Sequence, residues 1–397
     1  MKVWTYSRAV LAACTLAFFA TMAARLVISP VVPAISNTFG VSNAAIGVAL
    51  TGMWLAYAAA QFPSGLLADR YGERSIILVS VGGTALACAS IAVSPSFETF
   101  AAGAVVLGGV AGLHFSVATS LLTRILSRIG SAIGIHTAGA PLAGLAVPMV
   151  AGAVGAWLGW RWALALGAGI AIPTAVLFAV VVRPAAPARP NASVWGRVRP
   201  DPIVELLARP PIALTASLSV LGAFVWQGTA SFLPAFLIEH HGYGTARAGT
   251  LFSFYFAVQG FAQPALGALS DRLGRYPVAA LAVGTGVAGY VALVVATEHW
   301  AIVGAVASTG LAMSWGAALL PAFMDYLGDD ERSAGFGLIR TAYMMLGAGG
   351  SLAVGAAADV FGWGIAFLGL AGILALMLGT LLYDILRRRS HTAAATK

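Results

Sequence analysis

The sequence predicts an all-α membrane protein in which twelve transmembrane helices form two six-helix bundles related by a pseudo-two-fold axis along the membrane normal. Three observations predict this fold. Hydrophobic residues make up 59% of the 397 positions, and charged residues only 9%. Apolar runs long enough to cross a bilayer recur along the whole chain. A motif from the first half of the chain also recurs in the second half.

The composition excludes a soluble globular protein. The mean hydropathy is +0.89, and a soluble domain of this length needs a far larger charged surface. The net charge of +8 could suggest nucleic acid. The basic residues gather in alternate loops, however, so we expect a lipid bilayer and no nucleic acid as partner. Cys14 and Cys88 lie inside apolar runs, where we expect them to pack helices.

About 20 apolar residues cross the hydrocarbon core of a bilayer, and the chain contains twelve runs of this kind. The first run is too long for the apolar core of a signal peptide, so we interpret it as a retained helix. The predicted spans cover residues 9–33, 44–67, 75–93, 99–122, 131–154, 162–182, 212–237, 247–268, 277–296, 300–323, 334–357 and 363–385.

The basic residues predict the orientation. If both termini are cytoplasmic, 18 of the 22 Lys and Arg residues lie on the cytoplasmic side. Only Arg161 and Arg247 then lie outside, and Arg25 and Arg340 lie within helices. Such a bias is typical of a multi-pass protein of the cytoplasmic membrane.

One long polar break divides the chain. Residues 183–211 hold seven prolines and five arginines, which indicates a cytoplasmic linker. The predicted domains are therefore an N-terminal six-helix bundle at 1–182, this linker, and a C-terminal six-helix bundle at 212–397 with a basic cytoplasmic tail.

An internal repeat relates the two bundles. Residues 61–74 (QFPSGLLADRYGER) recur as residues 263–275 (QPALGALSDRLGR), which places Asp69 and Asp271 202 positions apart. A second similarity, between 136–138 and 340–342, has an offset of 204. Two similarities at nearly one offset indicate duplication of a six-helix unit.

With this motif the sequence resembles the major facilitator superfamily of secondary transporters, and the resemblance covers the whole chain. Residues 65–74 resemble the family's signature loop between helices two and three, and residues 267–275 resemble its copy between helices eight and nine. We interpret these loops as a conformational latch made by Gly65, Asp69, Arg70, Gly72, Arg74, Gly267, Asp271, Arg272, Gly274 and Arg275.

The residue types of the latch have physical roles. Gly72 and Gly274 suit a tight turn, and small residues at Gly65 and Gly267 permit close helix approach. Asp69 and Asp271 can accept backbone N–H groups at a neighbouring helix N-terminus. The alternative is a solvated turn whose charges set the topology. The sequence departs from the family at Glu73 and Tyr276, where the family usually has a basic residue.

Charged residues inside membrane spans are costly and are therefore candidates for function. Arg25 lies deep in the first span, and we expect it to bind substrate. Arg340 lies near the start of the eleventh span, so it could bind substrate, extend to the cytoplasm, or pair with Asp325 or Asp329. All acidic residues fall in loops or at helix ends. A cavity with arginine and no carboxylate suits an anion that accepts a bidentate guanidinium contact.

Other polar and aromatic residues could line the same cavity. They can contact substrate, or they can join helices by hydrogen bonds and packing. These candidates are Tyr57, Gln61, Trp226, Gln227, Gln259, Gln263, Trp315 and Tyr343. His114 and His136 complete the predicted substrate site as the embedded groups that titrate near neutral pH. Either could carry a coupled proton, and either could instead be a helix-packing residue.

The sequence therefore predicts a secondary transporter that moves a small organic or inorganic anion by alternating access. A proton or counter-substrate gradient would drive it, because no Walker motif is present. The alternative is a multidrug or metabolite efflux permease that works as a proton antiporter. An enzyme is not expected, since the chain has no reactive cluster such as His-Glu-x-x-His. We expect no cofactor, no metal site and a monomer.

Overall fold

The structure is a computed structural model that describes residues 3–187, 205–328 and 332–395. Most of the predicted linker lies outside the described residues. So do nine charged residues used in the sequence analysis, namely Lys2, Arg189, Arg197, Arg199, Asp201, Asp329, Asp330, Glu331 and Lys397.

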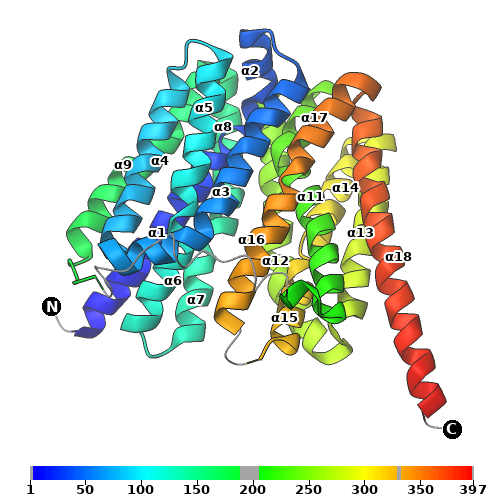
Figure 1. Cartoon of the computed structure of the whole chain (residues 1–397). Helices are drawn as coiled ribbons and strands as arrows, with labels where there is room; N and C mark the ends of the chain where they lie inside the picture. The colour runs from blue at the N-terminus through cyan, green and yellow to red at the C-terminus, as the bar shows by residue number, and fades with distance from the viewer. Residues whose placement is uncertain (1–2, 188–204, 329–331, 396–397) are drawn as a thin grey trace. The chain divides into compact units, whose positions relative to one another are not determined.

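The described residues are almost entirely helical (Figure 1). The helices before the linker are α1 (Val3–Leu26), η1 (Ser29–Val31, a 3₁₀ turn), α2 (Val32–Phe39), α3 (Asn43–Tyr71), α4 (Glu73–Ala92), α5 (Phe97–Gly112), α6 (His114–Ile125), α7 (Ile129–Thr137), α8 (Gly139–Leu158) and α9 (Trp160–Val181). The helices after the linker are α11 (Pro210–Glu239), α12 (Thr245–Leu273), α13 (Arg275–Val295), α14 (His299–Ala312), α15 (Gly316–Tyr326), α16 (Arg332–Gly347), α17 (Gly349–Phe361) and α18 (Trp363–Ala395).

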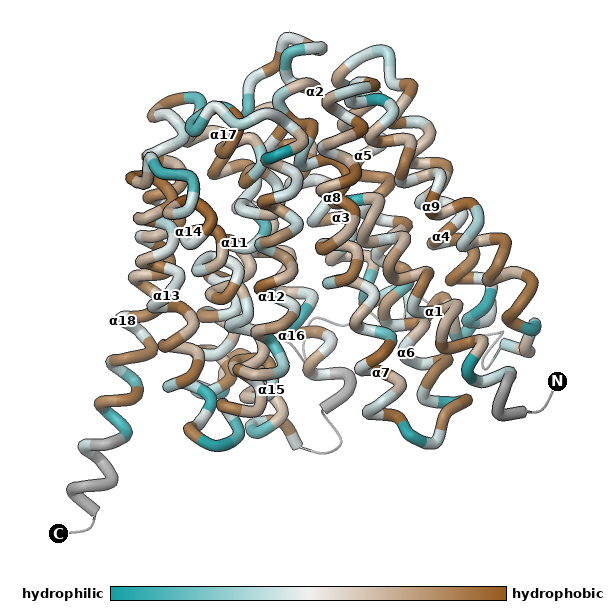
Figure 2. The backbone as a smooth tube through the Cα atoms, turned by 180° about the vertical axis from the view of Figure 1, so that it is seen from behind, coloured by the Kyte–Doolittle hydropathy of each residue, from teal (hydrophilic) through white to brown (hydrophobic). Residues whose placement is uncertain are grey.

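These helices confirm an all-α membrane protein. Single helices, or helices in series across a short break, match each of the twelve predicted spans within the described residues. Eleven of the twelve segments are long and apolar enough to cross a membrane. The twelfth, α12, is not among them and carries polar residues such as Ser253, Gln259 and Gln263 along its length. Hydrophobic residues run along the helices and hydrophilic residues concentrate near their ends (Figure 2).

Two helix starts show how the sequence sets local structure. Ser42 precedes α3, and its side chain accepts a hydrogen bond from the backbone N–H of Ala45. Ser96 precedes α5 and forms a reciprocal capping box with Thr99. Each cap satisfies backbone N–H groups that the first turn of a helix leaves without intrahelical partners.

The chain divides into two compact units. The first comprises residues 1–200 and 230–253, and the second comprises residues 201–229 and 254–397. The helices α11 and α12 therefore each contribute residues to both units.

Three pairs of glycines give both halves of the chain the same backbone turns. Each member of a pair has a φ between +64° and +94°, a conformation that glycine adopts readily. The separations within the pairs are 202, 202 and 203 positions, which agrees with the offset of the sequence repeat. The pairs are Gly40 and Gly242, Gly72 and Gly274, and Gly159 and Gly362.

Close helix packing also repeats. A Cβ atom at Gly108 of α5 would lie 1.9 Å from the carbonyl oxygen of Met53 in α3. A Cβ atom at Gly310 of α14, 202 positions later, would lie 2.5 Å from the carbonyl oxygen of Tyr255 in α12. Only glycine allows the backbones to approach so closely at these two crossings.

Five of the twelve spans are interrupted within the described residues. The interruptions follow Leu26 and fall at Leu113 and Ala138, and later at residues 313–315 and at Ala348. A helix end leaves backbone groups without intrahelical partners. In a membrane protein such ends are tolerated where they are buried in protein or line a cavity. The breaks therefore indicate where a binding site can form.

Candidate functional site

Arg25 lies at the first of these breaks. It is in the last turn of α1, near the middle of its span Tyr6–Phe39, and its residue is 1% exposed. Its Nε donates a hydrogen bond to the carbonyl of Thr21 at 3.1 Å. The sequence predicts Arg25 inside one continuous helix, whereas the structure places it where that helix ends. A helix C-terminus favours a positive charge, so the break stabilises the guanidinium.

Two aromatic rings of α3 contact the Arg25 guanidinium. Its Cζ lies 3.8 Å from the ring centroid of Tyr57 and 5.1 Å from that of Trp54. The two rings meet edge to face with centroids 6.1 Å apart, and both residues are 3% exposed. A desolvated cation–π contact contributes about 2 kcal/mol or more. The sequence analysis missed Trp54, although its position one turn before Tyr57 on the same helix could have identified it.

Two histidines also flank helix breaks in the first unit. His114 begins α6 directly after the break at Leu113, and His136 lies two residues before the break at Ala138. Both are 0% exposed, and their ring centroids are 5.4 Å apart. Phe18 of α1 contacts both rings, with centroid distances of 5.9 Å to His114 and 5.2 Å to His136. The structure therefore brings the two predicted histidines together.

The described acidic residues lie near helix ends, apart in sequence from Arg25, His114 and His136. Every described Asp or Glu lies at a helix cap, within the first or last turn of a helix, or in the last part of α18. In the described part of the chain, no three His, Cys, Asp or Glu residues come together to hold a metal ion. Arg25 is thus a buried basic residue that lies apart in sequence from the described acidic residues.

In the second unit, Gln259 of α12 stands 202 positions after Tyr57. The Nε2 of Gln259 donates a hydrogen bond to the carbonyl of Met313 at 2.9 Å. The backbone carbonyl of Gln259 accepts a hydrogen bond from Ser314 Oγ at 3.1 Å. Both partners lie in the break between α14 and α15. Gln259 therefore satisfies backbone groups that this break exposes, which is a helix-joining role and does not prevent contact with substrate.

Gln227 of α11 stands 202 positions after Arg25. Its Nε2 donates a hydrogen bond to the carbonyl of Met344 at 3.1 Å, four residues before the break at Ala348. Its Oε1 is buried and meets no hydrogen-bond partner among the described residues. The second unit therefore has an uncharged acceptor where the first unit has a cation.

The remaining predicted site residues differ in exposure. Gln61, Trp315 and Tyr343 are buried, Trp226 and Arg340 are half-buried, and Gln263 is exposed. Trp226 meets the ring of Phe256 with centroids 6.4 Å apart. Gln61 and Gln263 hold equivalent positions in the repeat but have different surroundings, so the repeat alone does not assign them one role.

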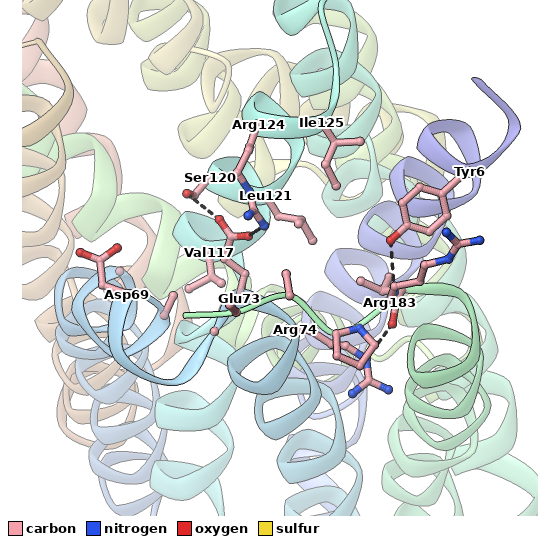
Figure 3. Close-up of a pocket in the computed structure, with 17 residues that line it drawn as sticks. Tyr6, Asp69, Glu73, Arg74, Val117, Ser120, Leu121, Arg124, Ile125 and Arg183 are labelled. Carbon is pink, nitrogen blue, oxygen red and sulfur yellow. Dashed lines mark hydrogen bonds and ion pairs between the residues drawn. The ribbon is translucent and has the colours of Figure 1, made fainter. Parts of the chain in front are cut away.

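The first signature loop lines a cavity of about 450 Å³ in the first unit (Figure 3). Asp69, Gly72, Glu73 and Arg74 contribute to its wall, together with residues 182–186 at the start of the linker. The N–H of Arg183 donates to the hydroxyl of Tyr6 at 3.1 Å. The linker therefore begins in contact with the loop predicted to be the latch.

Arg74 ties this loop to α9. Its Nε donates to the carbonyl of Val182 at 2.6 Å, and its Nη2 donates to the carbonyl of Ala179 at 2.8 Å. These carbonyls belong to the C-terminal end of α9, where a cation is favoured. Arg74 therefore fixes the start of α4 against the end of α9.

The residue by which the loop departs from the family, Glu73, has a specific partner. It forms an ion pair with Arg124 at the end of α6 and accepts a hydrogen bond from Ser120 at 3.0 Å. In the second signature loop, Arg275 pairs with Asp325 of α15 at 3.2 Å and with Asp271. Glu73 and Arg275 are 202 positions apart, and their partners Arg124 and Asp325 are 201 apart. The two halves therefore build the same ion pair with opposite polarity.

We expect Glu73 and Arg124 to be energetically coupled. Glu73→Gln and Arg124→Gln should each lower the free energy of unfolding, by about 0.2–1 kcal/mol because Arg124 is largely exposed. The exchanged variant Glu73→Arg with Arg124→Glu should regain most of the loss, since it adopts the polarity of the second half. Thermal unfolding of the purified single and double variants measures the coupling. Strictly additive effects would show that the pair is not coupled.

Two glycines of the predicted latch have open surroundings within their own units. A Cβ atom at Gly65 would meet no atom within 4 Å, and one at Gly267 would meet only the carbonyl oxygen of Ala317 at 3.9 Å. These glycines therefore do not serve close helix packing inside their own units. The crossings at Gly108 and Gly310 do so instead, because the sequence motif does not report which helix surfaces meet.

Comparison with known proteins identifies a family over nearly the whole chain and relatives over parts of it. A family model of the Major Facilitator Superfamily matches residues 14–254 and 244–397. The "Probable nitrate/nitrite transporter NarK2" of Mycobacterium tuberculosis is 27% identical over 67% of this chain and 67% of its own. The "Uncharacterized MFS-type transporter Rv1250" of the same species is 28% identical, but the alignment spans only 31% of its length. The "Cephamycin export protein CmcT" of Amycolatopsis lactamdurans is 29% identical over 62% of this chain and 46% of its own.

Solved structures share the fold at low sequence identity. A bacterial homologue of the human lysosomal transporter Spinster, in an inward-facing and occupied conformation, has a TM-score of 0.81. It is 18% identical and the alignment covers 95% of this chain and 96% of that one. A D-xylose–proton symporter has a TM-score of 0.78 at 15% identity, with 95% and 97% of the two chains covered.

Proposed function

Because the chain belongs to the Major Facilitator Superfamily, whose members are transporters rather than enzymes, we propose that it moves a small anion by alternating access of its two six-helix halves. The proposal places the protein in the cytoplasmic membrane with both termini in the cytoplasm, as the bias of the basic residues predicts.

The single observation that carries this proposal is the setting of Arg25. Its guanidinium lies near mid-span, against the faces of Tyr57 and Trp54, whereas the described acidic residues lie near helix ends. An aromatic face stabilises a cation without cancelling its charge. A carboxylate or another oxyanion can cancel that charge, and it can accept two parallel N–H bonds from the planar guanidinium.

The free energies support an anion as the partner. Burying a charge at mid-membrane costs between about 3 and more than 10 kcal/mol. The aromatic contacts contribute about 2 kcal/mol or more, and the helix terminus up to about 2 kcal/mol. Together, the aromatic contacts and the helix terminus offset the lower estimate of the burial cost, but they offset only part of the upper estimate. A bound anion would supply further stabilisation, and it would do so only when the substrate is present.

A relative supports the same class of substrate. The name of NarK2 describes a nitrate/nitrite transporter, and that protein aligns with two thirds of this chain. Nitrate and nitrite are small planar or bent oxyanions, which suit a planar guanidinium. We therefore include nitrate among the test anions.

A second candidate function is efflux of drugs or metabolites. Two relatives favour it by name, the cephamycin export protein and a "Multidrug resistance protein B homolog" of Mycobacterium tuberculosis that is 31% identical over 37% of this chain. The aromatic residues around Arg25 could also contact an apolar solute. Lipophilic cations would, however, be repelled by the positive charge of Arg25.

Uptake into proteoliposomes separates the two functions. The purified protein would be tested with labelled nitrate, formate, acetate and phosphate, and with the cationic dye ethidium. The proposal expects uptake of at least one anion above protein-free liposomes, and no movement of ethidium. Movement of ethidium without movement of any of the anions would establish the efflux function instead.

A further inference from the structure

The pair of buried histidines has no assigned task in anion binding by Arg25. His114 and His136 are both 0% exposed, and Phe18 packs against both rings. By strict hydrogen-bond geometry the four buried ring nitrogens meet no partner among the described residues, and the backbone of Cys14 lies beside both rings. Buried polar groups of native proteins are nearly always hydrogen-bonded. Two adjacent exceptions inside a membrane bundle therefore indicate a functional role.

The pair is linked to Arg25 through one face of α1. Phe18 contacts both imidazoles, and Arg25 lies seven residues later, which is about two turns and about 10 Å along the same face. The charge of Arg25 interacts electrostatically with His114. On the neighbouring helix α1, the groups that interact with the histidine pair are the backbone of Cys14 and the charge of Arg25. The charges of α4 and α6, such as Glu73 and Arg124, lie at the ends of those helices.

We propose that His114 and His136 together hold the proton that moves with the anion, and this inference rests on the anion function proposed above. Neutral imidazole offers one donor and one acceptor nitrogen, so either ring can take up one added proton. A second added proton would place two like charges with ring centroids 5.4 Å apart near a guanidinium. The pair therefore holds one proton at a time.

The coupling follows from the charges on the shared face of α1. A protonated histidine pair and the Arg25 guanidinium repel each other while the anion site is empty. An anion bound at Arg25 removes that repulsion and adds an attraction, so anion and proton bind better together than apart. Linkage is reciprocal, and the proton must increase anion affinity by the same factor as the anion increases proton affinity. The expected direction is therefore symport of anion and proton.

The test measures how pH changes the affinity of the purified full chain for nitrate. Nitrate is chosen because it does not itself titrate in this range. Between about pH 8 and about pH 5.5, the affinity of the wild type should increase by about 5- to 150-fold. A pH indicator in weak buffer should show uptake of up to about one proton per nitrate bound. Formate, which remains ionised over this range, is the second probe.

The variants are His114→Gln, His136→Gln and the double variant, with His299→Gln at the start of α14 as the matched control. The double variant should show nitrate affinity that no longer changes with pH and no proton uptake, whatever its absolute affinity. The control should keep both signals. Persistence of both signals in the double variant would overturn the inference, as would a wild-type affinity that does not depend on pH.

The two failures can be told apart. If the wild type binds neither nitrate nor formate at any pH, the proposed anion function fails. If it binds either anion with no dependence on the histidines, only the proton assignment fails. Where the double variant does not fold, the single variants decide the question, because at least one of them should lose most of the pH dependence and of the proton uptake.

Discussion

Proteoliposomes that contain the Arg25→Gln variant are expected to take up nitrate or formate at the rate of protein-free liposomes, although the protein still folds. The substitution removes the charge and the planar pair of donors, and it leaves a bound anion buried without its counter-charge. Truncating one partner of a buried, hydrogen-bonded charge pair costs about 2–5 kcal/mol or more, which is about 30-fold to several thousand-fold in affinity. Loss of this size is the largest effect expected of any substitution in the chain.

Arg25→Lys should fall between the wild type and Arg25→Gln. Lysine keeps the charge but loses the planar fork and the stacking on Tyr57. Arg8→Gln is the matched control, because Arg8 lies on the same helix and is exposed. Size-exclusion profiles and thermal unfolding establish that each variant is folded. Full uptake by folded Arg25→Gln protein would assign Arg25 to packing at the break of α1 and would favour the efflux function.

The second large effect is expected at Gly108. Gly108→Ala would place a Cβ atom 1.9 Å from the carbonyl oxygen of Met53. That oxygen belongs to the backbone of α3, so no change of side-chain rotamer can remove the overlap, and α3 and α5 must move apart. Overpacking of this kind costs about 1–3 kcal/mol and sometimes more. Since Trp54 follows Met53 directly, the displacement should also move the aromatic contacts of Arg25 and reduce anion uptake.

Gly109→Ala is the matched control for this prediction. It lies on the same helix, and its Cβ would come no closer than 4.0 Å to another atom, the Cβ of Ala56. Both variants change backbone entropy in the same way, so the difference between their melting temperatures isolates the helix crossing. Gly108→Ala should unfold at a clearly lower temperature than Gly109→Ala. Equal melting temperatures would show that α3 and α5 adjust to the extra methyl group without strain.

The fold could be predicted because its determinants are averages over many residues. Apolar runs of bilayer length located all twelve spans, and for α4 and α9 the predicted start lies two residues after the observed one. The sequence repeat reappears as pairs of glycines with positive φ, such as Gly72 and Gly274. A turn that only glycine adopts readily leaves a signal in the sequence as well as in the backbone.

The helix breaks could not be predicted, because they do not change hydropathy. The first span reads as one apolar run from residue 9 to 33, whereas α1 ends at Leu26 and the segment resumes as α2. Arg25 and the two histidines were selected because charged and titratable groups are rare in membranes. The structure adds that each lies at or within two residues of a break.

The sequence analysis also did not predict contacts between residues that are distant in sequence. Glu73 was noted only as a departure from the family, and its ion pair with Arg124 joins residues 51 positions apart. Trp54 was missed because an aromatic residue in an apolar span is usually a packing residue. Its contact with Arg25 depends on how α1 and α3 meet. The spacing of one helical turn between Trp54 and Tyr57 was a local signal, whereas the pairing of Glu73 with Arg124 follows from tertiary packing alone.

Binding of anions to the purified protein, measured by isothermal titration calorimetry, tests the central claim most directly. Formate should bind the wild type and the Arg8→Gln control, whereas formamide, which has nearly the same shape and no charge, should not compete with it. Arg25→Gln should bind neither compound. If formamide competed as well as formate, or if folded Arg25→Gln bound formate as tightly as the wild type, then Arg25 would not be the anion site.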